Sequence, residues 1–272
     1  MACNHDCEHC ASNGGCGDQP NAHERVHIPP PNNHIKKIIG IVSGKGGVGK
    51  SLVTGLLASA MNKKGNISAI LDADITGPSI PKLFNVHGML KSDGLYMFPA
   101  ESKNGIKIVS MNLCLPNEND PVVWRGPVLA GVVQQFWDET EWDNVDYMFV
   151  DMPPGTGDVP LTVFQTLPVD GIVIVTTPQE LVSMIVNKAL KMAELMKIPV
   201  LGIVENMSYF ECPNCKTKHY IYGESHVEKT GIKTISRLPI DPKIAELCDA
   251  GQLEDYDAGK FLEEIITKIE EV

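Results

Sequence analysis

Two cysteines separated by two residues, Cys212 and Cys215, provide half of the ligands of a soft-metal site. Tetrahedral zinc and iron–sulfur clusters usually take four protein ligands, and a Cys-x-x-Cys pair supplies two of them. The only later cysteine is Cys248, 33 positions further on, so the second pair of a zinc ribbon is missing. His219 offers at most a third ligand. The pair therefore predicts a metal site that needs ligands from elsewhere.

Three interpretations of this pair are open. The first is a zinc site with an unidentified fourth ligand. The second is a redox dithiol, but such motifs usually sit where a helix N-terminus lowers the thiol pKa, whereas Pro213 and the following Lys-Thr-Lys-His-Tyr indicate a loop or hairpin. The third is a site shared by two copies across a two-fold axis, where two pairs give the four thiolates of a [4Fe–4S] cluster.

A second segment with chemical potential is GKGGVGKS, residues 44–51, which fits the phosphate-loop pattern G-x-x-x-x-G-K-[ST]. Its glycines let backbone N–H groups point at phosphate oxygens, and a helix N-terminus adds a favourable potential. We expect Lys50 to reach the β- and γ-phosphates and the Ser51 hydroxyl to bind Mg²⁺. The predicted nucleotide-binding residues of this loop are Gly44, Lys45, Gly46, Gly47, Val48, Gly49, Lys50 and Ser51.

Carboxylates follow two other apolar segments. Asp151 lies at the end of the apolar strand predicted at residues 147–152 and is placed to hold Mg²⁺ through water. The Gly-rich turn after it can respond to a γ-phosphate. Asp72 and Asp74 end another run, and one of them is a candidate to orient the attacking water. Aspartate is also common at strand ends and turns, so the residues alone leave the role of Asp74 open.

The sequence lacks a complete guanine-recognition motif. GTPases of this broad class commonly read guanine with Asn-Lys-x-Asp. Here the segment NKAL, residues 187–190, has Leu190 in place of the aspartate and falls within a predicted helix. ATP is therefore the expected nucleotide, and the expected enzymatic activity is that of an ATPase.

The elements that must position these residues alternate between strands and helices. Strands are predicted at residues 36–43, 66–74, 147–152, 171–177 and 200–207, and helices at residues 50–65 and 181–197. Strands that are apolar throughout and separated by helices indicate a doubly wound α/β fold, with a mainly parallel sheet covered on both faces. Residues 1–33 are interpreted as a flexible Cys-rich tail, and residues 34–272 as the P-loop ATPase domain that carries the Cys-x-x-Cys loop.

The composition limits the partners. The 272 residues have 23 basic and 34 acidic side chains, a formal charge of −11, which disfavours nucleic acid and anionic membranes. The N-terminus shows no signal peptide, and no apolar run approaches the roughly 18 residues of a spanning helix. We therefore expect a cytoplasmic protein, whose eight cysteines serve metal or redox chemistry rather than disulfides.

Several segments together resemble one family. Lys45 inside the phosphate loop is typical of the deviant Walker A ATPases, which include MinD, ParA and the nitrogenase iron protein. The segments GKGGVGKS, DADITGPSIP, VVWRGP, DMPPGTGD, TTPQE, ENMSYFECPNC and LPIDP resemble the Mrp/ApbC family in matching order over residues 36–250. Members of that family are iron–sulfur cluster carrier or scaffold ATPases.

The resemblance implies roles that the residues alone do not establish. It implies a homodimer with facing nucleotide sites, in which Lys45 reaches the partner's nucleotide. It implies that Asp74 positions water and that Asp151 is the Walker B carboxylate. Further residues implied by it are Asn206, Pro239 and Asp241 on the adenine side, and Cys212 and Cys215 as ligands of a bridging [4Fe–4S] cluster for delivery to apo iron–sulfur proteins.

Two other activities found within this class of ATPase are disfavoured by the sequence. A MinD- or ParA-type positioning ATPase is disfavoured, because the C-terminal segment FLEEIITKIEEV is an acidic amphipathic helix and the chain carries a charge of −11. A nitrogenase-type reductase uses two single, widely separated cysteines per subunit rather than Cys-x-x-Cys. A zinc-binding P-loop ATPase remains as a further alternative.

The N-terminal cysteines form a separate group, Cys3, Cys7, Cys10 and Cys16. The first three have the spacing of radical S-adenosylmethionine enzymes, but no barrel pattern follows them. The last three resemble the N-terminal cluster motif of the eukaryotic cytosolic scaffold branch of the family, where the first cysteine stands much further upstream. A second cluster and a metal-scavenging tail rich in histidine are therefore both open.

Overall fold

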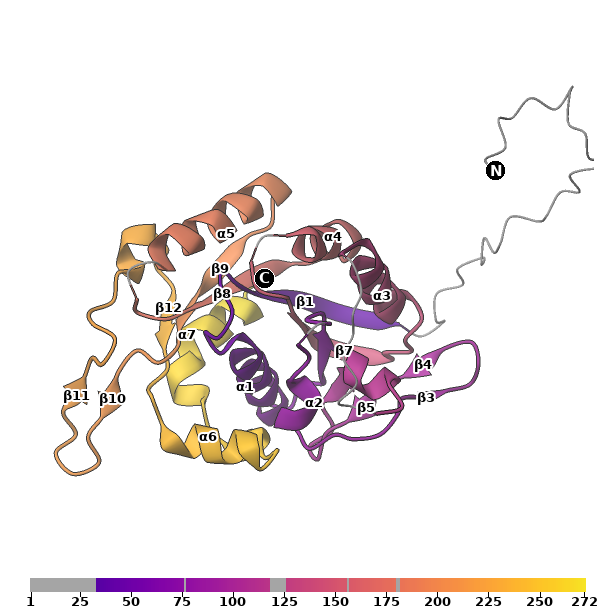
Figure 1. Cartoon of the computed structure of the whole chain (residues 1–272), viewed down its shortest axis with the longest axis horizontal. Helices are drawn as coiled ribbons and strands as arrows, with labels where there is room; N and C mark the ends of the chain where they lie inside the picture. Colours follow the sequence, from indigo (N-terminus) through magenta and orange to yellow (C-terminus); the bar gives the residue numbers. More distant parts are fainter. Residues whose placement is uncertain (1–32, 76, 118–125, 156, 180–181) are drawn as a thin grey trace, which may run out of the picture.

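The core of the structure is a single large sheet. A computed structural model describes residues 33–75, 77–117, 126–155, 157–179 and 182–272. The strands of the sheet are β1 (His34–Ser43), β2 (Ser68–Asp72), β5 (Ala100–Glu101), β6 (Lys107–Val109), β7 (Asn144–Asp151), β8 (Gly171–Thr176), β9 (Val200–Glu205) and β12 (Ile235–Arg237). Their order is β12-β9-β8-β1-β7-β2-β6-β5, and only the β5–β6 pair is antiparallel (Figure 1). The predicted mainly parallel sheet is confirmed.

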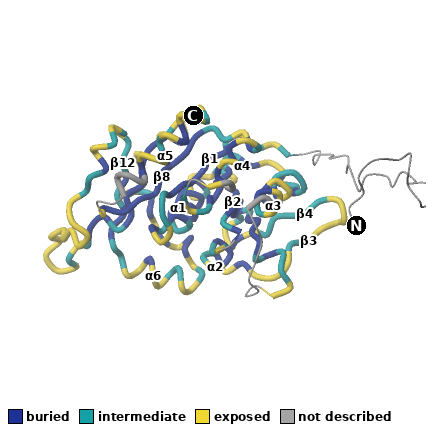
Figure 2. The backbone as a smooth tube through the Cα atoms, turned by 45° about the horizontal axis from the view of Figure 1, so that its top comes forward, coloured by how far each residue is buried: buried dark blue, intermediate teal, exposed yellow. Residues whose placement is uncertain are grey.

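Helices cover both faces of this sheet, as the predicted doubly wound fold requires. One layer contains α1 (Lys50–Lys63), α2 (Ile80–Leu83), α6 (Pro242–Asp249) and α7 (Gly259–Glu270), and the other contains α3 (Gly126–Asp138), α4 (Asp158–Thr166) and α5 (Val182–Met196). Because strand side chains alternate between faces, Ile39 and Ile41 of β1 pack with the α1 layer, whereas Ile38 and Val42 pack with the other layer. Both cores are buried (Figure 2).

Helix α1 has a defined end at each terminus. It begins after Gly49, whose φ of +83° few other residues adopt. At its C-terminus the Gly65 N–H donates to the Asn62 carbonyl at 2.9 Å, and the Asn66 N–H donates to the Met61 carbonyl at 3.2 Å. This pair of bonds is a Schellman motif with glycine in the left-handed position. The predicted helix and its stop at Gly65 are confirmed.

Short elements surround the sheet. They are the strand pairs β3 (Lys91–Ser92) with β4 (Met97–Phe98) and β10 (Phe210–Glu211) with β11 (Lys218–His219), and the 3₁₀ helices η1 (Met111–Cys114), η2 (Val227–Thr230) and η3 (Leu253–Asp255). Residues 209–224, which include β10 and β11 and which we name the cysteine hairpin, project beyond the β12 edge of the sheet (Figure 1). The hairpin or loop predicted around Pro213 is confirmed.

Asn33, which directly precedes β1, is held by two hydrogen bonds. Its Nδ2 donates to the Thr140 carbonyl at 2.8 Å, and its Oδ1 accepts from the Trp142 N–H at 2.7 Å.

The four N-terminal cysteines, Cys3, Cys7, Cys10 and Cys16, lie outside the described residues, so their role as cluster ligands stays a prediction. Among the described helices, none combines the length and the apolar character that crossing a membrane would need.

Candidate functional site

The phosphate loop forms a preorganised cavity between β1 and α1. The cavity has a volume of about 260 Å³ and is lined by residues of the predicted loop except Gly44 and Val48, with Asp74 and Pro154 on its wall. Gly47 and Gly49 have φ values of +78° and +83°, which glycine adopts without strain. No side chain caps the start of α1, which suits an anion at the helix N-terminus.

The buried carboxyl group of Asp151 connects the side chains of this site. It ends β7 and accepts hydrogen bonds from Lys50 Nζ at 2.6 Å, Ser51 Oγ at 2.5 Å and Thr54 Oγ1 at 2.9 Å. The Ser51 hydroxyl and the Asp151 carboxylate are hard oxygen ligands of the kind that Mg²⁺ prefers, so the donor set fits that ion. The sequence interpretation missed Thr54, although its position four residues after Lys50 places both on one face of α1.

Asp72 and Asp74 have different environments. Asp72 is fully buried, pairs in register with Asp151 across β2 and β7, and accepts from Ser110 Oγ at 2.9 Å. Burial, and next the Asp151 charge, raise the pKa of Asp72 to about 8. Asp74 lines the cavity, and its Oδ2 lies 3.9 Å from Lys50 Nζ. Of the two candidates, only Asp74 faces the phosphate cavity.

Lys45 and Asn206 each connect the loop to another part of the chain. Lys45 Nζ donates to Gln179 Oε1 at 2.7 Å on the exposed surface. Asn206 is buried, and its Nδ2 donates to the Val48 carbonyl at 2.9 Å. A Cβ at Gly49 would lie 2.2 Å from this Nδ2, so Asn206 packs directly against the loop. Its predicted adenine contact stays a prediction, as does the reach of Lys45 across a dimer.

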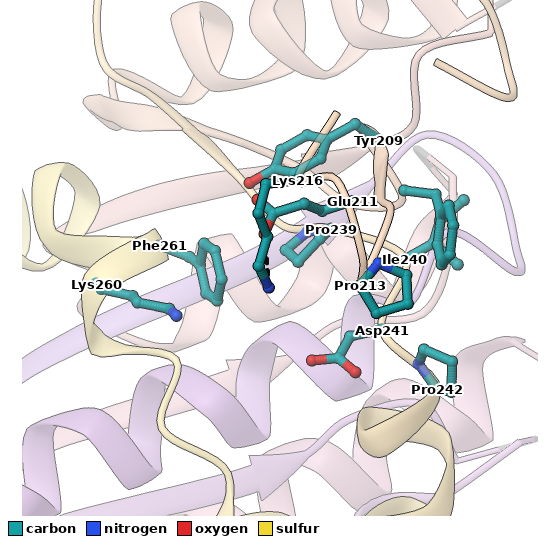
Figure 3. A pocket seen from close by; sticks show the side chains of 11 residues that line it. Tyr209, Glu211, Pro213, Lys216, Pro239, Ile240, Asp241, Pro242, Lys260 and Phe261 are labelled. Atoms are coloured by element: carbon teal, nitrogen blue, oxygen red, sulfur yellow. Dashed lines mark ion pairs between the residues drawn. The ribbon is translucent and has the colours of Figure 1, made fainter. Parts of the chain in front are cut away.

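Pro239 and Asp241 line a second cavity, of about 520 Å³, together with the cysteine hairpin (Figure 3). The hairpin contributes Pro213 and Lys216, and the latter pairs with Glu211 at 3.7 Å. This cavity shares no lining residue with the phosphate cavity. The Pro-Ile-Asp-Pro turn and the hairpin are separate features in the sequence. The structure shows that they line the same cavity.

The Asp241 carboxylate has two partners in this structure. Its Oδ1 accepts from the Lys243 N–H at 2.9 Å and caps α6, and its Oδ2 accepts from the Tyr256 hydroxyl at 2.9 Å. Burial, followed by this hydrogen bond, raises the pKa of Tyr256. Asp241 therefore fixes the wall of the second cavity, and its predicted contact with adenine stays a prediction.

The Cys-x-x-Cys pair sits at the tip of the cysteine hairpin. The Cys212 N–H donates to the Thr217 carbonyl at 3.0 Å, and the Lys216 N–H donates to the Cys212 carbonyl at 2.9 Å. The exposed Cys215 thiol donates to Thr217 Oγ1 at 3.3 Å, and hydrogen bonding with Thr217 lowers the pKa of Cys215 to about 7. No helix begins at the pair, unlike in a typical redox dithiol.

The described residues supply no third ligand to this pair. Within them, no group of three or more His, Cys, Asp or Glu side chains is placed to hold a metal ion. Cys114 and Cys248 are partly buried, and burial raises the pKa of both thiols, that of Cys114 to about 11. These two cysteines behave as packing residues, as the sequence predicts. The half-site character of Cys212 and Cys215 therefore persists in the folded chain.

The fold and the phosphate site together define a P-loop NTPase, and solved structures agree. A nucleotide-binding protein from Archaeoglobus fulgidus, in complex with ADP, is 44% identical with a TM-score of 0.73 over 82% of this chain and 89% of that one. The cell division ATPase MinD of Pyrococcus furiosus, 20% identical, has a TM-score of 0.61 over 86% of this chain and 98% of that one, which is a likeness of fold alone.

The family follows from closer relatives. The family model described as ParA, NUBPL iron-transfer P-loop NTPase, matches residues 34–271, and the chain belongs to this family. The iron-sulfur cluster carrier protein of Clostridium perfringens is 43% identical over 96% of this chain and 94% of that protein. The protein of the same name from Methanocaldococcus jannaschii is 41% identical over 99% and 97%. The resemblance drawn from the motifs is confirmed.

Proposed function

We propose that this chain is an ATP-hydrolysing carrier that holds a [4Fe–4S] cluster between two copies of itself and transfers it to apo iron–sulfur proteins. The observation that carries the proposal is the pair formed by the half-buried Cys212 and the exposed Cys215, for which the described residues offer no third ligand. Two copies related by a two-fold axis bring four thiolates together, which completes the ligand set of such a cluster. The iron-sulfur cluster carriers among the relatives support this chemistry.

Nucleotide handling is assigned to the residues around Asp151. Bound Mg²⁺ and ATP supply the transferable phosphoryl group and its neutralising charge. Lys50, now 2.6 Å from the Asp151 carboxylate, would bind the phosphates, and Ser51 and Asp151 would then hold Mg²⁺. Asp74, on the cavity wall, orients the attacking water. The charge of Lys50 thus changes partner when nucleotide enters.

The dimer completes the nucleotide site. Lys45 leaves Gln179 and reaches the nucleotide of the partner subunit, so that two copies are held together by ATP. Asn206, Pro239 and Asp241 contact the adenine side, and Cys3, Cys7, Cys10 and Cys16 provide a second cluster site. The carrier works in the cytoplasm, with apo-proteins rather than nucleic acid or membranes as its partners.

The test compares two cysteine pairs. Cys212→Ala with Cys215→Ala removes the proposed ligands, and Cys114→Ala with Cys248→Ala is the matched control. After anaerobic reconstitution with iron and sulfide, the first variant is expected to bind about four irons fewer per dimer than wild type and to lose transfer to an apo-acceptor. The control keeps both properties. Equal iron in both variants, or zinc in place of iron in purified wild type, would overturn the shared-cluster proposal.

A further inference from the structure

Glu205 is a fully buried carboxyl group outside the phosphate site. Of the carboxyl side chains described, only it, Asp72 and Asp151 have no exposed surface. A carboxyl group removed from water is destabilising unless hydrogen bonds and opposite charge compensate it. Glu205 ends β9, which lies between β8 and β12 in the sheet, so its compensating partners must come from the segments around that point.

Those partners lie at the two ends of the cysteine hairpin. The Ser208 hydroxyl, immediately before the hairpin, donates to Glu205 Oε1 at 2.6 Å. The Ser225 hydroxyl, immediately after the hairpin, donates to Oε2. Arg237 of β12 adds a positive charge, with Nε 3.5 Å from Oε1, and pairs on its outer side with Glu228. One carboxyl group therefore holds both ends of the segment that carries Cys212 and Cys215.

The next residue contacts the phosphate loop. Asn206 follows Glu205 directly, and its side chain donates to the Val48 carbonyl at 2.9 Å while its N–H donates to the Thr176 carbonyl at 2.8 Å. Met207 then turns the chain with a φ of +54°, and its N–H donates back to Asn206 Oδ1. Residues 205–208 thus form a short rigid connection from the phosphate loop to the base of the hairpin.

The same connection is held on its other side by the turn that leads to Asp241. The Leu238 N–H donates to the Glu205 carbonyl at 3.0 Å, and the Ser208 N–H donates to the Leu238 carbonyl at 2.9 Å. The Ile240 N–H donates to the Tyr209 carbonyl at 2.7 Å. Backbone hydrogen bonds therefore join this turn to the hairpin base, and the Asn206 side chain joins the hairpin base to the phosphate loop.

We propose that Glu205 is the positioning residue that couples the nucleotide state to the orientation of the cysteine hairpin. Because its two oxygens bind both ends of the hairpin, the hairpin moves with Asn206 as one body instead of swinging on two independent hinges. The inference rests on the proposed function for its purpose, since it explains how nucleotide controls the metal-binding pair. The coupling itself, in which the orientation of the hairpin depends on bound nucleotide, requires no cluster.

Two substitutions test this coupling. Glu205→Gln keeps the size of the side chain but places its amide N–H₂ group against a serine hydroxyl or Arg237. Ser225→Ala removes only the hydrogen bond at the C-terminal end of the hairpin. The readout is hydrogen–deuterium exchange of the full chain, with and without a non-hydrolysable ATP analogue and Mg²⁺. In wild type the analogue is expected to slow exchange in both residues 44–51 and residues 207–225.

In both variants the hairpin is expected to exchange at least about tenfold faster without nucleotide, as loss of a hydrogen bond to a charged group implies. The analogue then protects residues 44–51 only. Glu228→Gln, which removes the exposed partner of Arg237, is the matched control and keeps the wild-type response. Should Glu205→Gln fail to fold, Ser225→Ala decides the question alone.

The outcome separates this inference from the proposed function. A hairpin that still responds to nucleotide in both variants, or one that does not respond in wild type, overturns the coupling role of Glu205. If the cysteine experiment contradicts the bridging cluster, the hydrogen-exchange result is unaffected, because the exchange is measured without iron. A bridging cluster with an unresponsive hairpin overturns the coupling alone.

Discussion

Replacement of Gly49 by alanine tests how the phosphate loop is held. Gly49 has a φ of +83°, and a Cβ there would lie 2.2 Å from Asn206 Nδ2. The backbone conformation alone disfavours an L side chain by about 1 kcal/mol. The contact is far too short to persist, so Asn206 must move as well.

The second contribution comes from Asn206. When its amide moves, the 2.9 Å bond to the Val48 carbonyl is lost, and the side chain is only 2% exposed, so water does not replace the partner freely. A buried polar group left without its bond destabilises by about 1–3 kcal/mol. Together the two contributions predict that Gly49→Ala lowers the free energy of unfolding by about 2–4 kcal/mol.

Urea denaturation of the nucleotide-free chain measures this difference. Gly65→Ala, at the other end of α1, is the matched control, since its φ is +90° but a Cβ there meets no atom within 4 Å. It is expected to lose only the backbone contribution of about 1 kcal/mol. Equal losses for Gly49→Ala and Gly65→Ala would refute the argument that Asn206 braces the loop. ADP binding, measured by calorimetry, should weaken only for Gly49→Ala.

Three further predictions concern titration and catalysis. Because the pKa of Asp72 is raised in the folded chain to about 8, its proton stabilises the fold at low pH and this contribution is lost as the pH rises from about 4 to about 8. Asp72→Asn should flatten this decline in urea unfolding followed across that range, and a slope equal to wild type would contradict it. Iodoacetamide at pH 7.5 should alkylate Cys215 before Cys114, because the pKa values of these thiols are about 7 and about 11. Mass mapping that finds Cys114 alkylated first would contradict this order of thiol pKa values. Asp151→Asn should reduce phosphate release from Mg-ATP at least about a hundredfold, since Lys50 and Ser51 lose their anionic partner, and a loss under tenfold would argue against its Mg²⁺ role.

The parts of the site that are local in sequence could be predicted from it. The phosphate loop, Lys50 and Ser51 follow from one continuous pattern between a strand and a helix. Asp151 follows from the end of an apolar run, and the Gly65 stop from helix-end preferences. Each of these depends on neighbours within a few residues, which is why the pattern alone predicts them.

The remainder depends on which distant segments meet. The register of β2 against β7 buries Asp72 beside Asp151, and this burial, followed by the Asp151 charge, raises the pKa of Asp72, while Asp74 is left facing the cavity. No local pattern distinguishes those two aspartates. The partners of Glu205 are likewise spread from Ser208 to Arg237, and their common carboxyl group is visible only in the folded chain.

The convergence of Ser208 and Ser225 on one carboxyl group means that the cysteine hairpin leaves and re-enters the domain at nearly the same point. Such an excursion is a modular insertion, because its removal leaves two chain ends that a short turn can join. The exposed tip that carries Cys212 and Cys215 can therefore change in length or sequence while the buried Tyr209 at the base of the hairpin stays in place. A fold of this kind can therefore gain or lose the Cys-x-x-Cys tip by a change confined to one segment of the chain.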